Sequence, residues 1–383
     1  MALHFSEAEL AARRAATMAG LRERNLHGLL MFRQESMYYL SGYDTFGYTF
    51  FQCLYLGADG TLTLLTRAPD LRQARHTSVI EDIRIWVDAE GHNPAEDLKA
   101  ILAEHGGAGQ TLGIEFDAHG LTAHNWRLIE GVLAGFCTVQ DASDLVSRQR
   151  VIKSPGELDY VRRAAELADQ AWDEAVRLAG PGVFEGDILA AMQGAVFRGG
   201  GDYPGNEFII GSGRDALLCR YFSGRRHLQA RDQLTLEFAG AYRHYHACLM
   251  RTLLVGQASA EHRRMHGACV ATLEACETAL RPGQPIGQVF DAHARSMDEA
   301  GYRHARLNAC GYSLGTTYTP CWMDWPMFHH GNPVPAQPGM VFFLHMILMD
   351  SEAERAMTLG HTVLVTEHGC ERLNRAALDL VVV

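Results

Sequence analysis

The spacing of apolar residues changes near residue 150 and divides the chain into two predicted domains. In the first part, short apolar runs alternate with turn residues and with a helical stretch over residues 94–106. The runs "CLYLG" and "TLTLL" flank Ala58-Asp59-Gly60, a pattern that predicts a β-hairpin. Further strands are predicted at "IRIWVDA" and "TLGIEFD". We therefore expect residues 1–150 to form an α/β domain.

A helix at the domain junction opens the second part. Ser154 can cap this helix, Pro155 suits its first turn, and Glu157 completes a capping box. Apolar residues then recur at helical spacing until the glycines and proline of residues 180–182 end the pattern. A second helix is predicted over residues 184–198.

Strand-like segments dominate the rest of the chain. They are "NEFIIGSG", "DQLTLEFAGAYRHYHACLMRTLLVG", "GMVFFLHMILMD" and "HTVLVTE", with helices expected at about residues 258–280 and 285–301. Runs of strands interleaved with helix pairs are typical of α+β domains. We predict that residues 151–383 fold around a curved antiparallel sheet, so the whole chain is α+β with two domains.

Composition and charge restrict the class of protein. The 383 residues exceed what one hydrophobic core usually serves, and 47% hydrophobic with 21% charged residues is typical of a folded enzyme. The net charge of -11, with scattered basic residues, argues against a nucleic-acid partner. No apolar run is long enough to span a bilayer, and the amino terminus lacks the pattern of a signal peptide. We expect a cytoplasmic protein that acts on a small molecule and has no membrane partner.

The cysteines give little sign of a metal or disulfide framework. None of the nine forms a C-x-x-C pair, which disfavours both a zinc finger and a set of disulfides. Most cysteines are expected to be small buried residues. Cys248 stands apart because it lies among titratable side chains on a predicted strand.

Titratable side chains interrupt three otherwise apolar strands. An ionisable group on a buried strand needs a partner, so groups from separate strands are expected to converge on one cleft. A single histidine in an apolar strand is more often a hydrogen-bonded core residue, whereas a lone carboxylate is costly to bury without a partner. The interrupting residues are Glu237, His244, His246, Cys248, His345 and His361.

The order of these segments resembles the pita-bread fold shared by creatinase, ectoine hydrolase, Xaa-Pro dipeptidase and methionine aminopeptidase. The resemblance covers essentially the whole chain, because residues 1–150 are similar to a creatinase-type amino-terminal domain. It is carried by "VIKSPGELDYVRRAA", "GGDYP", "LRPGQPIGQVFDAH", "GYSLG" and "PGMVF" followed by "TVLVTEHGCERLN". These motifs are specific for the fold and much less specific for the reaction.

The resemblance also shows where this chain departs from the metallopeptidases. Those enzymes hold two metal ions with two aspartates, a histidine and two glutamates. The corresponding positions here are Glu237, Cys248, Tyr312, His345 and Gly360. Glycine supplies no ligand and tyrosine is a poor one, so the set lacks hard anionic donors. We predict a site without metal and a protein without a cofactor.

Creatinase and ectoine hydrolase share the fold and hydrolyse small carbon–nitrogen substrates without metal, and the ectoine hydrolase pattern is the most similar. The histidine that serves as their base corresponds to Arg220, which cannot accept a proton and is expected to clamp a substrate carboxylate. His361 corresponds to a substrate-contacting histidine of creatinase. We therefore expect His345 or His361 to be the base, Glu237 to stabilise positive charge, and Tyr312 to donate a hydrogen bond to the reacting centre.

Several other side chains are expected to contact the substrate. Aromatic residues around a carboxylate favour a small cation or zwitterion. In creatinase-like homodimers, the amino-terminal domain of one subunit closes the active site of the other, which would bring an aromatic loop to the partner's pocket. The predicted binding residues besides Arg220 are His246, Cys248, Tyr48, Trp322 and Asp324.

Three functions stay open at this point. The first is a metal-independent hydrolase of a zwitterionic, guanidino or amidine substrate. The second is an Xaa-Pro dipeptidase-like enzyme with an atypical metal on Glu237, His246, Cys248 and His345. The third is a non-catalytic protein that binds a small molecule. Cys248 is either a thiolate nucleophile or a small residue that fills space.

Overall fold

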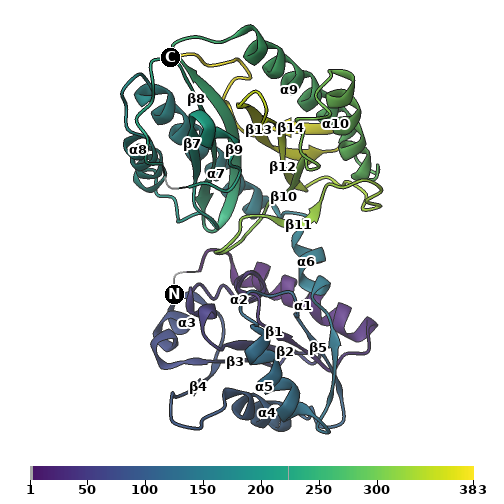
Figure 1. The fold of residues 1–383 in the computed structure, drawn as a ribbon. Helices are drawn as coiled ribbons and strands as arrows, with labels where there is room; N and C mark the ends of the chain where they lie inside the picture. Colours follow the sequence, from purple (N-terminus) through teal and green to yellow (C-terminus); the bar gives the residue numbers. More distant parts are fainter. Residues whose placement is uncertain (1–2, 223) are drawn as a thin grey trace. The chain divides into compact units, whose positions relative to one another are not determined.

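The structure is a computed structural model that describes residues 3–222 and 224–383. The chain forms two compact units, Met1–Arg150 and Val151–Val383. Each is described by itself (Figure 1).

The amino-terminal unit is built around a mixed sheet in the order β4-β3-β2-β1-β5-β6. β2 and β3 form the antiparallel hairpin expected around Ala58-Asp59-Gly60, while β5 and β6 run parallel to β1 and to each other. The strands are β1 (Gly28–Met31), β2 (Cys53–Gly57), β3 (Leu62–Arg67), β4 (Asp82–Trp86), β5 (Thr111–Ile114) and β6 (Thr138–Asp141).

Helices cover both faces of this sheet. Adjacent strand residues point to opposite sides, so each face has its own apolar cluster that helices cover. Leu29 and Met31 pack with residues of α1 and α2, whereas Leu30 packs with residues of α4 and α5. The helices are α1 (Glu7–Glu23), α2 (Gln34–Ser41), α3 (Leu71–Thr77), α4 (Pro94–Glu104), α5 (Ala123–Leu133) and α6 (Asp144–Arg150), with short 3-10 turns at η1 (Gly47–Thr49) and η2 (Ala68–Asp70).

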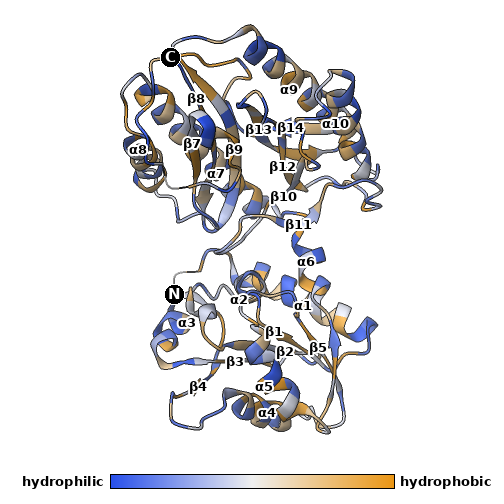
Figure 2. Cartoon of the chain, in the orientation of Figure 1, coloured by the Kyte–Doolittle hydropathy of each residue, from blue (hydrophilic) through white to orange (hydrophobic). Residues whose placement is uncertain are grey.

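The carboxy-terminal unit contains a curved antiparallel sheet in the order β11-β10-β12-β13-β9-β8-β7, with β14 paired to β13. Hydrophobic colours dominate the strands in Figure 2. The strands are β7 (Ile209–Ser212), β8 (Asp232–Tyr242), β9 (Tyr245–Val255), β10 (Gly311–Ser313), β11 (Asp324–Met327), β12 (Val341–Asp350), β13 (Arg355–Thr366) and β14 (Gly369–Arg372), with a 3-10 turn η3 (Gly213–Leu217) after β7.

The predicted capping box begins the first helix of this unit: the Ser154 side chain accepts from the Glu157 N–H, and the Glu157 side chain accepts from the Ser154 N–H. This helix packs so closely on β8 that a Cβ at Gly240 would lie 2.0 Å from the Ala164 carbonyl oxygen. The helices are α7 (Pro155–Leu178), α8 (Glu185–Arg198), α9 (Ala260–Ala279) and α10 (Gly287–Glu299).

Helices α7, α9 and α10 pack on the same face of the sheet. Ala247 of β9 lies in a cluster with α7, and Leu344 of β12 lies in a cluster with α9 and α10. The strand register places both residues on one side, which we call the helix face. The opposite side, the open face, carries the polar residues described next. Among the described residues, no helix combines the length and the apolar run that crossing a bilayer requires.

Candidate active site

The strand register brings most of the predicted site residues to the open face. Residues directly opposite in paired strands share a face, as do every second residue along a strand. Met250 lies opposite both Glu237 and Gly360, and Gly360 lies opposite His345. Tyr312 lies opposite Phe343, two residues before His345. The open face therefore carries Glu237, His246, Cys248, Tyr312, His345 and Gly360.

A hydrogen-bonded chain runs from Trp322 through Tyr312 to Glu237. The indole Nε1–H of Trp322 donates to the Tyr312 hydroxyl at 2.8 Å, and that hydroxyl donates to Glu237 Oε1 at 3.3 Å. All three side chains are buried. Since Trp322 can only donate, the Tyr312 proton must point toward the carboxyl group. The phenol is thus held as a donor to Glu237.

Burial sets the acidity of Glu237. Loss of hydration raises its pKa to about 7, although the Tyr312 hydrogen bond and the positive charge of Arg220 act in the opposite direction. Arg220 follows η3 and is exposed, so its charge is screened by water. A carboxyl group with this pKa populates both protonation states near neutral pH, which is the property of a proton-transfer group.

His345 lies beside Tyr312 but is a weak base. Its ring centroid is 5.6 Å from that of Tyr312 and 5.3 Å from that of Phe343. Burial, together with the charges of His293 and Arg220, lowers its pKa to about 3. Nδ1 of His345 is buried and has no hydrogen-bond partner among the described residues. The imidazole is therefore neutral at physiological pH and is a poor acceptor for a proton from water.

His246 is fully engaged in holding two loops. Its Nε2 accepts the Gly205 N–H at 2.8 Å, and its Nδ1 lies 3.1 Å from the Thr317 hydroxyl. Burial lowers the pKa of His246 to about 4. Because both ring nitrogens are occupied, His246 positions the segments at residues 205 and 317 and offers no free nitrogen to a ligand. This is the core-histidine interpretation that the sequence left open.

Cys248 behaves as a small buried residue. It has no exposed surface, and burial raises the pKa of its thiol well above the usual value, with the Glu237 charge acting in the same direction. A thiolate is therefore strongly disfavoured at this position. The environment supports the space-filling interpretation over the nucleophile.

His361 does not lie on the open face. It is opposite Leu344 and next to Gly360, so strand alternation turns its side chain to the helix face. There its Nε2 is 2.6 Å from Glu277 Oε1 on α9, and Arg372 of β14 also binds this carboxylate. The expectation that His361 could be the base beside Glu237 is corrected by this register. Sequence reasoning missed Glu277, although an acidic residue next to the buried Cys276 on an apolar helix face was a usable signal.

Two predicted binding residues lie away from the hydrogen-bonded chain. Asp324 of β11 is opposite Ser313, the neighbour of Tyr312, and its Oδ1 accepts the Trp325 N–H at 2.9 Å. Tyr48 belongs to the amino-terminal unit, where it is buried within η1. Contact of either residue with a substrate stays a prediction.

The donor set on the open face does not fit a two-metal centre. Of the five positions that the sequence resemblance aligns with metal ligands, Glu237 alone supplies a carboxylate, and Gly360 supplies nothing. Burial raises the pKa values of Cys248 and Tyr312 well above their usual ranges, so neither is an anionic donor at neutral pH. The described residues contain no group of three or more histidine, cysteine, aspartate or glutamate side chains arranged for a metal ion.

Comparison with known proteins places the chain in a family. Residues 159–367 match Metallopeptidase family M24, and residues 13–152 match the Creatinase/Prolidase N-terminal domain. The chain is 25% identical to ectoine hydrolase of Halomonas elongata over 97% of both chains. It is 22% identical to Xaa-Pro dipeptidase of Pyrococcus furiosus over 71% of this chain and 76% of the relative.

Solved structures agree on the architecture. The prolidase from Thermococcus sibiricus is 18% identical and superimposes with a TM-score of 0.89, covering 99% of this chain and 100% of that one. At this identity the likeness shows the fold alone, and it is the pita-bread fold expected from the motifs. With its amino-terminal creatinase/prolidase domain and its carboxy-terminal pita-bread domain, the chain is a hydrolase that belongs to metallopeptidase family M24.

Proposed function

We propose that this protein is a cytoplasmic, metal-independent hydrolase that cleaves a carbon–nitrogen bond in a small zwitterionic, guanidino or amidine substrate. The observation that carries the proposal is Glu237, a buried carboxyl group with a pKa of about 7 that Tyr312 contacts by a hydrogen bond. Water activation near neutral pH needs a base with such a pKa. The similarity to ectoine hydrolase supports this substrate class.

In this proposal Glu237 takes the role that the sequence suggested for a histidine. His345, with a pKa of about 3, is a weak proton acceptor, and His361 lies on the helix face. The Glu237 carboxylate accepts a proton from water as the water oxygen bonds to the substrate carbon and the electron pair of that carbon's double bond moves onto its heteroatom. Once protonated, Glu237 holds the Tyr312 hydroxyl less strongly, which leaves that O–H able to donate to the developing tetrahedral centre. Protonated Glu237 then passes the proton to the departing nitrogen as the carbon–nitrogen bond breaks.

We assign the orientation of the substrate to two charged groups of the site, Arg220 and Glu237. Arg220 is exposed on the segment after η3, and its charge acts on both Glu237 and His345. A guanidinium group binds a carboxylate through two parallel hydrogen bonds, so Arg220 is suited to the carboxylate of a zwitterion. The cationic end of such a substrate would then face Glu237, where its charge favours the ionised carboxylate.

The test is a hydrolysis assay of the full chain before and after treatment with a chelator, with metal analysis of the purified protein. Ectoine, creatine and Xaa-Pro dipeptides represent the amidine, guanidino and peptide classes. We expect turnover of an amidine or guanidino compound that chelation leaves unchanged. Hydrolysis of a dipeptide that requires added metal would instead identify a metallopeptidase. Saturable binding with no turnover of any compound would identify a binding protein.

We further propose that the active form is a homodimer in which the amino-terminal unit closes the partner's active site. Phe46 and Phe50 flank η1 and are 78% and 48% exposed, which leaves apolar surface beside Tyr48 for a second copy to cover. Light scattering should give twice the chain mass of 42.3 kDa. A monomer that retains full activity would contradict this arrangement.

A further inference from the structure

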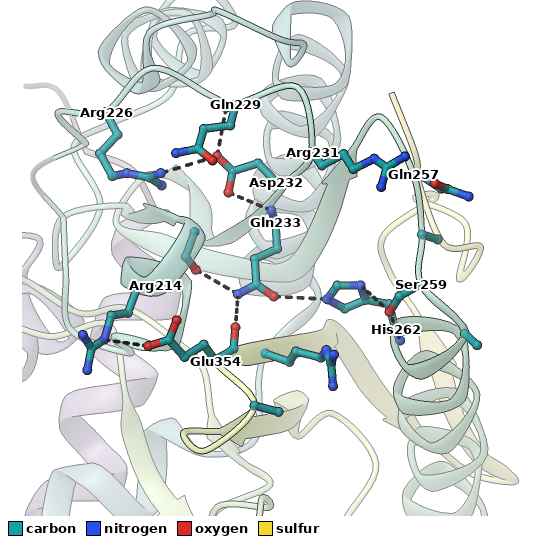
Figure 3. Close-up of a pocket in the computed structure, with 15 residues that line it drawn as sticks. Arg214, Arg226, Gln229, Arg231, Asp232, Gln233, Gln257, Ser259, His262 and Glu354 are labelled. Atoms are coloured by element: carbon teal, nitrogen blue, oxygen red, sulfur yellow. Dashed lines mark hydrogen bonds and ion pairs between the residues drawn. The ribbon is translucent and has the colours of Figure 1, made fainter.

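The carboxy-terminal unit contains a polar cavity that shares no lining residue with the hydrogen-bonded chain at Glu237. Its volume is about 660 Å³, within the usual range for small-molecule pockets. It lies where β8 begins, where β12 turns into β13, and where α9 begins (Figure 3). Its titratable lining residues are Arg214, Arg226, Arg231, Asp232, His262, Glu354 and Arg355, and burial lowers the pKa of His262.

A buried glutamine joins the walls of this cavity. The amide nitrogen of Gln233 donates to the Gly213 carbonyl at 2.8 Å and to the Glu354 carbonyl at 2.9 Å. Its amide oxygen accepts the Ala356 N–H at 3.0 Å and lies 3.2 Å from Nε2 of His262. All four hydrogen-bonding positions of the amide are thus used, and three separate segments are held together. Hydrogen bonds within the chain therefore hold the cavity walls in place.

The two acidic side chains are already engaged. Asp232 accepts the N–H groups of Gln229 and Gln233, each at 3.0 Å, and lies 3.6 Å from Arg226. Glu354 lies 3.5 Å from Arg214. Two of the four lining arginines therefore have carboxylate partners.

The other two arginines carry the excess charge. The side chains of Arg231, which is exposed, and Arg355, which is partly exposed, have no hydrogen bond or ion pair to any residue that the structure describes. Helix α9 adds to this field, because it is 20 residues long and begins at Ser259 in the cavity wall. The partial positive charge of a helix start favours anions. Among the lining residues, four guanidinium groups face two carboxylates, so the lining is net positive. Glu261 in the first turn of α9 interacts with the charge of Arg355, but this carboxylate is already paired with Arg264.

We propose that this cavity binds a small oxyanion with two or more negative charges, held by Arg231 and Arg355 at the start of α9. The planar guanidinium group matches phosphate and carboxylate oxygens in a two-point contact. The cavity is larger than inorganic phosphate alone needs, so a phosphate ester or a dicarboxylate also fits. The ligand chemistry common to these is a multivalent oxygen anion.

The experiment is calorimetric titration of the full chain with inorganic phosphate, glycerol phosphate and malonate, at one ionic strength set with chloride. We expect saturable binding of at least one of these three anions. The anion that binds most tightly identifies whether the ligand is phosphate, a phosphate ester or a dicarboxylate. In Arg231→Ala/Arg355→Ala, affinity should fall by at least tenfold. Arg303→Ala removes an exposed arginine outside the cavity and should bind as the wild type does.

A second variant controls for damage to the fold. Arg231→Lys/Arg355→Lys keeps both charges but removes the planar forks, so its affinity should lie between that of the wild type and that of the alanine double variant. The absence of saturable binding in the wild type would overturn the proposal. Equal affinity in the wild type and in a folded alanine double variant, judged by its melting temperature, would overturn it as well.

Discussion

Two glutamates on opposite sides of the same sheet, Glu237 buried and Glu277 partly buried, have pKa values shifted in opposite directions. Glu237 on the open face has a pKa raised to about 7, because burial outweighs one hydrogen bond and the distant charge of Arg220. Burial would also raise the pKa of Glu277 near the helix face, but hydrogen bonds from His361 and Arg372 outweigh it and lower the pKa to about 2. The difference lies in the partners and not in the residue type.

The comparison separates a structural carboxylate from a reactive one. Glu277 is permanently ionised because Arg372 supplies a compensating charge at 2.6 and 2.7 Å. Burial lowers the pKa of His361, so this histidine serves as a neutral N–H donor to the same carboxylate. Among the described residues, no cationic side chain forms an ion pair with Glu237, which can exchange a proton near neutral pH. The proposed function assigns the role of that partner to the cationic end of the substrate.

The largest expected effect is on turnover. Glu237→Gln removes the proton acceptor while keeping the shape of the side chain, so the hydrolysis rate should fall by about a thousandfold. Steady-state assays with the substrate found in the screen measure this effect. In the wild type, the rate should rise with pH and reach half its maximum near pH 7, since the ionised form is the active one.

Glu277→Gln is the matched control for that variant, because it makes the same chemical change on the other side of the sheet. Its rate per folded molecule should stay within about tenfold of the wild type. A thousandfold loss in Glu277→Gln, or a wild-type rate in Glu237→Gln, would remove the functional distinction between the two carboxylates.

The next largest expected effect is on the free energy of unfolding. Glu277→Gln leaves Arg372 without its partner and weakens the bond from His361. Because Arg372 is 39% exposed, the free energy of unfolding should fall by about 1 to 2 kcal/mol at pH 7, less than for a fully buried pair. The depressed pKa of Glu277 stabilises the fold above its ordinary pKa of 4.5, and this contribution is lost as the pH falls toward 2. Urea unfolding from pH 3 to 7 should therefore show that the variant and the wild type converge at low pH. A constant difference would contradict the ion-pair explanation.

The faces of the sheet could largely be predicted from the sequence, because strand alternation is a local rule. The apolar runs of β8, β12 and β13 indicated strands, and the family motifs indicated which residues share the open face. The same rule should have excluded His361: Gly360 occupies an open-face position, so its neighbour must point the other way. That error came from following a motif position and ignoring the alternation.

The remaining features depend on contacts between distant segments. The nitrogens of His246 are occupied by Gly205 and Thr317, which lie 41 and 71 residues away in the sequence. No local pattern predicts such pairing. The pKa of Glu237 likewise depends on which charges the fold brings within reach, and the charge of Arg220 acts on it only through the turn after β7. Burial and loop closure had to be seen in three dimensions.

An effect on stability of similar size, opposite in sign to that of Glu277→Gln, tests the burial of Glu237. A raised pKa means that the unfolded state ionises first, so Glu237 costs stability increasingly from pH 4.5 to about 7 and by a constant amount above that. Glu237→Gln should therefore be about 2 kcal/mol more stable than the wild type at pH 8 and nearly equal to it at pH 4. Thermal unfolding at the two pH values measures the difference. A variant that is less stable at pH 8 would mean that Glu237 has a compensating cation.

The smallest effect concerns the outer end of the hydrogen-bonded chain. Trp322→Phe removes the N–H that holds the Tyr312 oxygen at 2.8 Å, a bond worth about 1 kcal/mol. The phenol can then turn away from Glu237, which loses part of the hydrogen bond that lowers its pKa. The rate should fall by at most about tenfold, and the midpoint of the pH–rate profile should move to higher pH. Tyr312→Phe should move the midpoint in the same direction with a larger loss of rate. If Trp322→Phe lowers the rate with no movement of the midpoint, Trp322 acts through packing and not through the acidity of Glu237.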